Sequence, residues 1–439
     1  MRDQMDRRLT ISSSSILLFL GLFPFLRLLP IDARVQPVVI FISILVLALN
    51  RKNWNIPLIE NRIVLTLICF LTIYAFISLN KFGLKNVIIE YISLIAGPVL
   101  FLCLTSIRNL KILNTTVFKT TVIIYIIFGL VEVSPLKTKI FPLLNNIIPL
   151  YKPYEVSSIF GFRGLSYAAP EPSNAAFIII TLLYLYQIFK KKNYDISKFW
   201  ELILISMAIL NKSGTMLLFL GFYFTSFYIL QNKNLRRLWI ILVPLSFVIS
   251  LTWIKISIEN DFNDNRMLQI ADRLTELSLS GEILESNNWY LISGPRFAEV
   301  GTGYSVLTRK FFGYGIGSIE QNFSEIIRLI GMDFGNYWND QLDNGFFDSS
   351  KPNSYLSFLA CSTGIVGVLM ILYFLFKIYK RISNFKFQNI KEVGLNLFWI
   401  SCFMILFRTT ATIPIPWILL ALIFQIQKFS FDESSPSLS

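Results

Sequence analysis

The sequence contains no histidine and little charge. Lys, Arg, Asp and Glu together make up 15% of the chain and apolar residues 54%, whereas a typical soluble domain has about 25% charged residues. Without histidine, the chain cannot use a Ser-His or Cys-His pair or a His-bound metal. The four cysteines stand apart in apolar runs, so neither a disulfide framework nor a zinc site is expected. The composition excludes a soluble single domain, a disordered chain and a coiled coil.

Long apolar runs with few charges fill much of the chain and predict transmembrane helices. The predicted fold class is an all-α polytopic integral membrane protein with about 12 transmembrane helices and two large extracytoplasmic loops that contain short helices. The stretch 199–230 could form one span or two, so a count of about 11 stays open. The predicted spans are 13–30, 35–49, 63–79, 87–106, 115–133, 174–189, 199–212, 214–230, 238–256, 353–376, 393–407 and 411–427.

The placement of Lys and Arg predicts the orientation of these spans. Basic residues gather in alternate connections, which places the N- and C-termini in the cytoplasm. The net charge of +13 is therefore assigned to a cytoplasmic rim facing anionic lipid and not to a nucleic-acid site. The predicted organisation is 1–133 with five spans, 134–173 as an extracytoplasmic loop, 174–256 with four spans, 257–351 as the larger extracytoplasmic loop, and 352–439 with three spans and a cytoplasmic tail.

The first candidate motif is FRGLSYAAPEPSNAAF, at the outer end of the sixth predicted span. Glu171 stands between two prolines where the helix is expected to begin, and proline suits the first turn of a helix. The unsatisfied N–H groups of such an outward-facing helix start attract anions. Arg163 is close enough in sequence to lie at the same helix start. Plain helix capping by Glu171 is the alternative.

The second candidate motif is SGPRFAEVGTGYSVLTRKFFGYGIGS, in the larger loop. Its basic residues Arg296, Arg309 and Lys310 could bind a diphosphate, because guanidinium groups bind phosphate oxygens in pairs. The Gly-Tyr-Gly-Ile-Gly turn would let the backbone approach a flat ligand such as a sugar ring. An ordinary solvated loop with salt bridges to nearby acids is the alternative.

The third candidate motif is PNSYLSFLACSTGIVG, where the larger loop returns to the membrane. Pro352 is expected to start the helix, with Asn353 and Tyr355 at its outer mouth. Lys212 lies in a tight outer turn that could face the same cavity. Glu90, near the outer end of the fourth span, could pair with an arginine or remain an interfacial acid.

Together the three motifs resemble those of the Wzy-type O-antigen and exopolysaccharide polymerases, within the wider O-antigen ligase/polymerase group. The likeness covers about 12 spans, two large outer loops and a few short patterns. In it Arg163 and Arg296 take the places of the family's loop arginines, Glu171 that of its Glu-Pro-Ser acid, and Lys212 falls at a turn where Ser or Arg is usual. Ligase members carry a histidine where this chain has Pro352, which favours polymerase over ligase.

The resemblance implies a metal-independent glycosyltransferase in the bacterial inner membrane that joins polyprenyl-diphosphate-linked oligosaccharide units at the outer leaflet. Glu171 and Arg296 would be the catalytic residues, and no cofactor is expected. The partners would be the lipid-linked oligosaccharide and membrane lipid, with a chain-length regulator protein left open and no nucleic acid. The alternatives are an O-antigen ligase-like enzyme, a flippase of lipid-linked oligosaccharides, and a non-catalytic assembly partner. The predicted substrate-binding residues are Arg163, Lys212, Arg309, Lys310, Asn353 and Tyr355.

Overall fold

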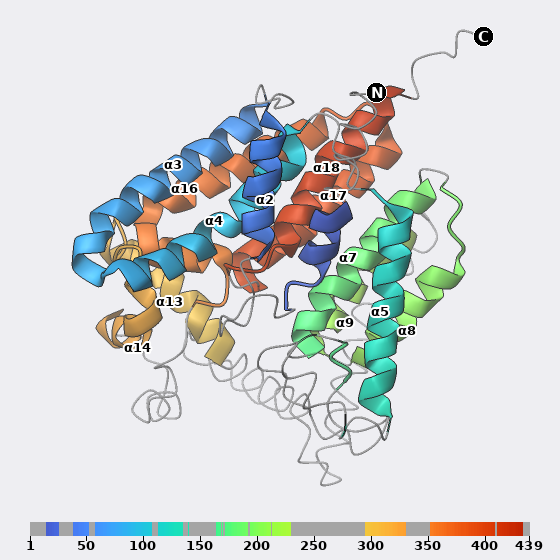
Figure 1. Ribbon diagram of the computed structural model, residues 1–439, viewed down its shortest axis with the longest axis horizontal. Helices are drawn as coiled ribbons and strands as arrows, with labels where there is room; N and C mark the ends of the chain where they lie inside the picture. The colour runs from blue at the N-terminus through green and yellow to red at the C-terminus, as the bar shows by residue number, and fades with distance from the viewer. Residues whose placement is uncertain are drawn as a thin grey trace, which may run out of the picture.

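The chain folds as a bundle of helices (Figure 1). A computed structural model describes residues 15–25, 38–51, 58–107, 113–134, 139, 164–167, 169, 172–191, 194–211, 213–229, 295–330, 352–408 and 411–432. In this part of the chain 84% of residues are helical and none lies in a strand, which confirms the predicted all-α class. The helices are α2 (Val38–Leu49), α3 (Ile59–Phe82), α4 (Leu84–Ser106), α5 (Thr115–Val133), α7 (Pro172–Lys191), α8 (Phe199–Asn211), α9 (Gly214–Phe224), α13 (Pro295–Arg309), α14 (Ile319–Ile330), α16 (Tyr355–Ser383), α17 (Gln388–Phe403) and α18 (Ile415–Asp432), with π-helical continuations η2 (Thr225–Ile229) of α9 and η4 (Met404–Arg408) of α17.

The surface of the bundle is apolar in the way a lipid environment requires. Six segments are long and apolar enough to cross a membrane, namely α3, α4, α5, α7, α16 and Ile390–Arg408, which joins α17 to η4. Large apolar side chains stay exposed along α3, α5, α8 and α16. A soluble protein rarely exposes so much contiguous apolar surface, whereas acyl chains cover it at no cost. The protein is therefore embedded in a membrane.

Helices α7 and α18 form the interior of the bundle. Their side chains are almost all buried, and α18 packs against α4, α7 and α17. The Trp417 ring stacks at 5.8 Å from Phe374 and meets Tyr355 edge-on at 5.2 Å. A Cβ at Gly97 of α4 would overlap the same indole, so the glycine lets the two helices approach closely. Close aromatic packing thus fills the centre of the bundle.

The helix ends define two opposite faces. The Pro172 face carries the α3–α4 turn at Gly83, the end of α5 and the starts of α7, α9, α16 and α18, and the Arg381 face carries their other ends (Figure 1, with the Arg381 face at the top). On the Arg381 face, the Arg381 guanidinium donates to both carboxylate oxygens of Glu60 at 2.8 and 3.0 Å and to Gln427 at 3.0 Å. This bidentate pair joins α16, α3 and α18. Among the described helices named here, each begins on one face and ends on the other, and which face is cytoplasmic stays a prediction.

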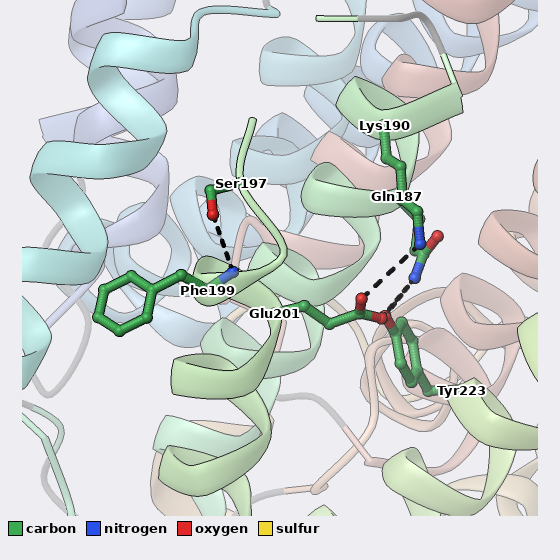
Figure 2. Close-up of polar contacts among 6 residues, drawn as sticks. All are labelled: Gln187, Lys190, Ser197, Phe199, Glu201 and Tyr223. Atoms are coloured by element: carbon green, nitrogen blue, oxygen red, sulfur yellow. Dashed lines mark hydrogen bonds and ion pairs between the residues drawn. The ribbon is translucent and has the colours of Figure 1, made fainter. Parts of the chain in front are cut away.

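A second buried acid joins α7, α8 and α9 (Figure 2). Glu201 Oε1 accepts hydrogen bonds from Gln187 Nε2 at 2.8 Å and from the Tyr223 hydroxyl at 2.7 Å. Lys190 Nζ lies 3.9 Å from Glu201 Oε2, and the lysine is partly exposed. At the start of α8, the N–H of Phe199 donates to Ser197 Oγ at 3.2 Å. The cluster satisfies a buried carboxylate and fixes the mutual positions of three helices.

Helix α16 is broken at Gly364, where a loop after α13 fills the gap. Gly364 has a left-handed φ of 65° inside the helix. The freed carbonyls of Cys361 and Ser362 accept hydrogen bonds from the N–H groups of Tyr314 (2.8 Å) and Gly315 (3.0 Å). In return, the N–H of Ile365 donates to the Phe311 carbonyl at 2.9 Å. The break therefore leaves none of these backbone groups unpaired, as a low-dielectric setting demands.

The helices can be compared with the sequence predictions in three places. The stretch 199–230 forms two helices, as the twelve-span count requires, but predicted span 238–256 lies outside the described residues and the count stays a prediction. Helix α16 begins at Tyr355 and not at Pro352, because Ser354 caps it by accepting the Ser357 N–H at 3.0 Å. The described part of the predicted larger loop contains the helices α13 and α14, and short helices were expected there.

Replacing Gly364 by Ala is expected to destabilise the protein by about 2 kcal/mol or more. The left-handed φ disfavours a side chain, and the added Cβ would overlap the Phe311 carbonyl oxygen. Gly221→Ala in α9 is the matched control, since a Cβ there meets nothing within 4 Å. Thermal unfolding of the purified proteins in detergent should give a lower Tm for G364A only. Equal Tm values for the two variants would contradict the close approach of loop and helix.

Candidate functional site on the Pro172 face

Glu132 anchors the segment that leads into α7. This carboxylate is buried near the end of α5, and its two oxygens accept the N–H of Ser166, both at 3.0 Å. Oε2 also accepts the N–H of Tyr167 at 3.1 Å. Hydrogen bonds to a charged acceptor are roughly twice as strong as neutral ones. Gly129, one turn earlier, makes room for the Tyr167 ring, because a Cβ there would lie 2.5 Å from Cε1.

Helix α8 holds the other side of the same segment. The Asn211 side-chain amide donates to the carbonyls of Leu165 and Pro172, both at 2.9 Å. The Tyr167 hydroxyl donates to the Met207 carbonyl at 3.1 Å. Tyr167 also has a left-handed φ of 46°, an unfavourable conformation that its contacts on both sides impose. Burial, and then the charge of Glu132, raise the pKa of Tyr167 above its ordinary value.

Two helix N-termini lie side by side on this face. Helix α7 begins at Pro172, as the sequence predicts, and its first carbonyl is bonded to Asn211 at the end of α8. Two residues separate the end of α8 from the start of α9, and the second of them, Ser213, is the N-cap of α9. Ser213 Oγ accepts the N–H of Met216 at 3.1 Å and donates to Asn211 Oδ1 at 2.6 Å. The positive ends of two helix dipoles therefore open on the same side of the bundle.

Arg408 adds a positive charge beside these helix starts. Its Nε and Nη2 donate to Thr215 Oγ1, in the first turn of α9, at 3.2 and 3.1 Å. In the same turn of η4, the Leu406 carbonyl accepts the Tyr304 hydroxyl of α13. Segment η4 thus contacts α9 through Arg408 and α13 through Leu406. No sequence motif singled out Arg408, which directly follows the predicted span 393–407.

A fourth buried acid, Glu90, holds the Gly-Tyr-Gly-Ile-Gly turn. Its two oxygens accept the N–H groups of Gly317 (2.6 Å) and Ile319 (2.5 Å), the latter being the first residue of α14. Ser78 of α3 accepts the N–H of Ile316 at 3.2 Å. The glycines bring the backbone against α3, α4 and α16: an added Cβ at Gly315 would lie 2.7 Å from the Phe82 ring. In the described bundle these glycines serve close packing, where the sequence suggested approach to a sugar ring.

Three of the predicted site residues, Arg163, Glu171 and Lys212, lie outside the described residues. Two of them are neighbours in sequence of described residues: Glu171 precedes the first residue of α7, and Lys212 stands between Asn211 and the N-cap of α9. Arg296 lies in the first turn of α13, with its side chain undescribed.

The other four predicted residues lie at the start of α16 and at the end of α13. Asn353 is half-buried just before the start of α16. Tyr355 is fully buried, and its hydroxyl donates to the Leu94 carbonyl at 2.9 Å, so in this structure it is a packing residue and not part of an open mouth. Arg309 and Lys310 are exposed at the far end of α13, next to α3. Glu132, Asn211 and Arg408 were not predicted as site residues at all.

The arrangement is suited to an anion. Two helix N-termini and a guanidinium lie together, and the described residues contain no cluster of three or more acids and cysteines that could hold a metal ion. No protein-family model, curated protein or solved structure matches the chain. Its function must therefore be argued from this geometry.

Glu132→Gln is expected to loosen the segment before α7. An amide carries no charge, and its NH₂ group would face the Ser166 N–H beside its one acceptor oxygen, so the bonds to Ser166 and Tyr167 are weakened. Hydrogen–deuterium exchange followed by mass spectrometry should show these amides exchanging roughly 10-fold faster or more. Glu325→Gln, on the exposed side of α14, removes the same charge and should leave their exchange unchanged. Identical exchange in E132Q and wild type would refute the anchoring role.

Proposed function

We propose that the protein is a polysaccharide polymerase that joins polyprenyl-diphosphate-linked oligosaccharide units at the outer leaflet of the bacterial inner membrane. The observation that carries the proposal is the anion-binding arrangement on the Pro172 face, where the starts of α7 and α9 lie beside Arg408. The segment directly before α7 carries Glu171 and leads from Arg163. The motif resemblance supplies the substrate class.

In this proposal the diphosphate of the donor lipid is the anion bound on the Pro172 face. A sugar hydroxyl of the acceptor unit attacks the anomeric carbon of the donor glycan, and the bond from that carbon to the diphosphate oxygen breaks. Polyprenyl diphosphate then leaves without taking a proton, provided that its charge is compensated. Arginine and helix N-termini supply this compensation, and one well-placed donor contributes roughly 3 kcal/mol. Arg296, with Arg163 and Lys212, is the proposed source of the further positive charge.

Glu171 is the proposed general base that takes the proton of the attacking hydroxyl. The α7 N-terminus favours its ionised form and so lowers its basicity, whereas burial beside a substrate would raise it. Anchoring of the preceding segment by Glu132 and Asn211 supports this role, because a base must be held within hydrogen-bond reach of its substrate. Asn353 is proposed as a polar contact to the glycan. The mechanism proposed uses neither a metal nor a nucleotide.

The interior of the described bundle favours an enzyme over a flippase. A flippase needs a polar path that lets a glycan cross the membrane, but the buried side chains of α7 and α18 are mostly large and apolar. The buried acids of the described helices lie near the helix ends, where they bind backbone groups or neighbouring side chains. This supports a fixed site at one face.

The proposal is tested with purified protein in nanodiscs supplied with lipid-linked repeat units. Wild-type protein should convert the units into a ladder of polymers on a gel. Arg296→Ala should slow this conversion by roughly 100-fold through loss of charge compensation, and Glu171→Gln by roughly 100-fold or more through loss of the base. Arg328→Gln, on the exposed side of α14, is the control and should leave the rate unchanged.

Two outcomes would contradict the proposal at different levels. Unchanged repeat units with well-folded wild-type protein would rule out a polymerase. A normal ladder from both R296A and E171Q would leave a polymerase but overturn the assignment of its site.

A further inference from the structure

One asparagine side chain binds both ends of the segment that leads into α7. The Nδ2 group of Asn211 carries two hydrogens, and it donates to the carbonyls of Leu165 and Pro172, both at 2.9 Å. These carbonyls stand at the two ends of residues 165–172, a stretch that includes Glu171. The N–H of Leu165 also donates to a carbonyl in the last turn of α8 at 3.0 Å. The end of α8 therefore holds the segment at both of its ends.

The same side chain is bonded to the start of α9. Asn211 Oδ1 accepts the Ser213 hydroxyl at 2.6 Å, and Ser213 Oγ accepts the N–H of Met216 as the N-cap of α9. Asn211 is fully buried, and its nitrogen and its oxygen both have partners. Only the nitrogen can donate to two carbonyls, so these partners define the orientation of the amide. One residue thus joins the starts of α7 and α9, which pack against α8 (Figure 1).

The segment is held in a conformation that its sequence does not favour. Tyr167 has a left-handed φ of 46°, and among the described residues it is the one non-glycine residue with a positive φ. Such a conformation persists only where surrounding contacts impose it, and it is concentrated at functional sites. The contacts here are the bond from the Tyr167 N–H to Glu132 and the bond from its hydroxyl to the Met207 carbonyl.

Helix capping alone does not account for the bonds of Asn211. An asparagine that caps the end of α8 would bind the carbonyls of α8 itself, but Nδ2 binds residues that lie 39 and 46 positions away in sequence. The carbonyl of Pro172 belongs to the first turn of α7, where the N–H one turn later is its normal partner. A second donor is not needed to satisfy it. The bond therefore sets where α7 starts relative to α8 and α9.

We propose that Asn211 is a positioning residue for glycosyl transfer, which fixes the backbone directly after Glu171 relative to the start of α9. This role rests on the proposed function, in which the donor diphosphate binds at the starts of α7 and α9 and Glu171 takes the proton of the acceptor hydroxyl. Displacing a catalytic group by about 1 Å can cost roughly 100-fold in rate. Asn211 itself touches no substrate and acts through Glu171.

A double-mutant cycle tests this role with purified protein in nanodiscs and lipid-linked repeat units. Asn211→Ala should lower kcat roughly 10- to 30-fold and leave KM within about 2-fold, because it displaces the base and not the bound diphosphate. In the Glu171→Gln background the same change should lower kcat less than about 3-fold, since the base is already absent. Asn211→Asp keeps the side-chain volume and the acceptor for Ser213 but loses both donors, so its kcat should fall as well.

The matched control is Asn61→Ala. Asn61 is fully buried on the Arg381 face, where its Oδ1 accepts the Thr105 hydroxyl at 2.7 Å. The change removes the same amide from the interior but leaves the 165–172 segment bonded, so kcat should equal that of wild type. Hydrogen–deuterium exchange gives a readout that does not depend on activity. The Ala169 N–H, bonded to the Ser166 carbonyl at 3.0 Å, should exchange faster in N211A and unchanged in N61A.

The possible failures are distinguishable. Equal losses of kcat from N211A with and without Glu171 would show a purely structural role and overturn the proposal, and so would unchanged exchange of the Ala169 N–H. A normal rate in E171Q would overturn the assignment of the base, and the lack of any ladder from folded wild-type protein would overturn the polymerase. Either of these last two results also removes the positioning role.

Discussion

The structure depends on one constraint: backbone N–H groups in a membrane protein must find acceptors inside the protein. Two buried carboxylates meet this need for the irregular segments of the Pro172 face. Glu132 accepts the N–H groups of Ser166 and Tyr167, and Glu90 accepts those of Gly317 and Ile319. Each acid lies on a long apolar helix and holds a segment far away in sequence. The face proposed to be catalytic is thus fixed by charge-to-backbone bonds.

Much of the helical framework could be predicted from apolar runs alone, because a span needs about 20 apolar residues whatever its neighbours are. The predicted span 115–133 coincides with α5. The partners of buried polar groups could not be predicted: nothing in the sequence distinguishes an acid that pairs with arginine, as Glu60 does, from one that binds backbone, as Glu90 does. The start of α16 was missed because Ser354, two residues after the proline, provides the capping oxygen.

The candidate site was predictable only as a location. The Pro-rich start of α7 was recognised, because proline and outward helix starts have sequence signatures. Asn211 and Arg408, which join that start to α9 and η4, are single polar residues at the ends of apolar runs, and only the fold brings them together. The lack of histidine gains meaning here, since arginine, helix dipoles and one glutamate remain for the proposed glycosyl transfer.

The account rests on the Pro172 face being outside the cell and the Arg381 face inside. Single cysteines at Lys85 and Lys386, both exposed, report these two faces in a chain whose four native cysteines are replaced. A membrane-impermeant maleimide added to spheroplasts should label the cysteine at position 85 and reach that at 386 only after the membrane is opened. The reverse pattern would place the proposed anion-binding face in the cytoplasm and contradict the proposed polymerisation at the outer leaflet.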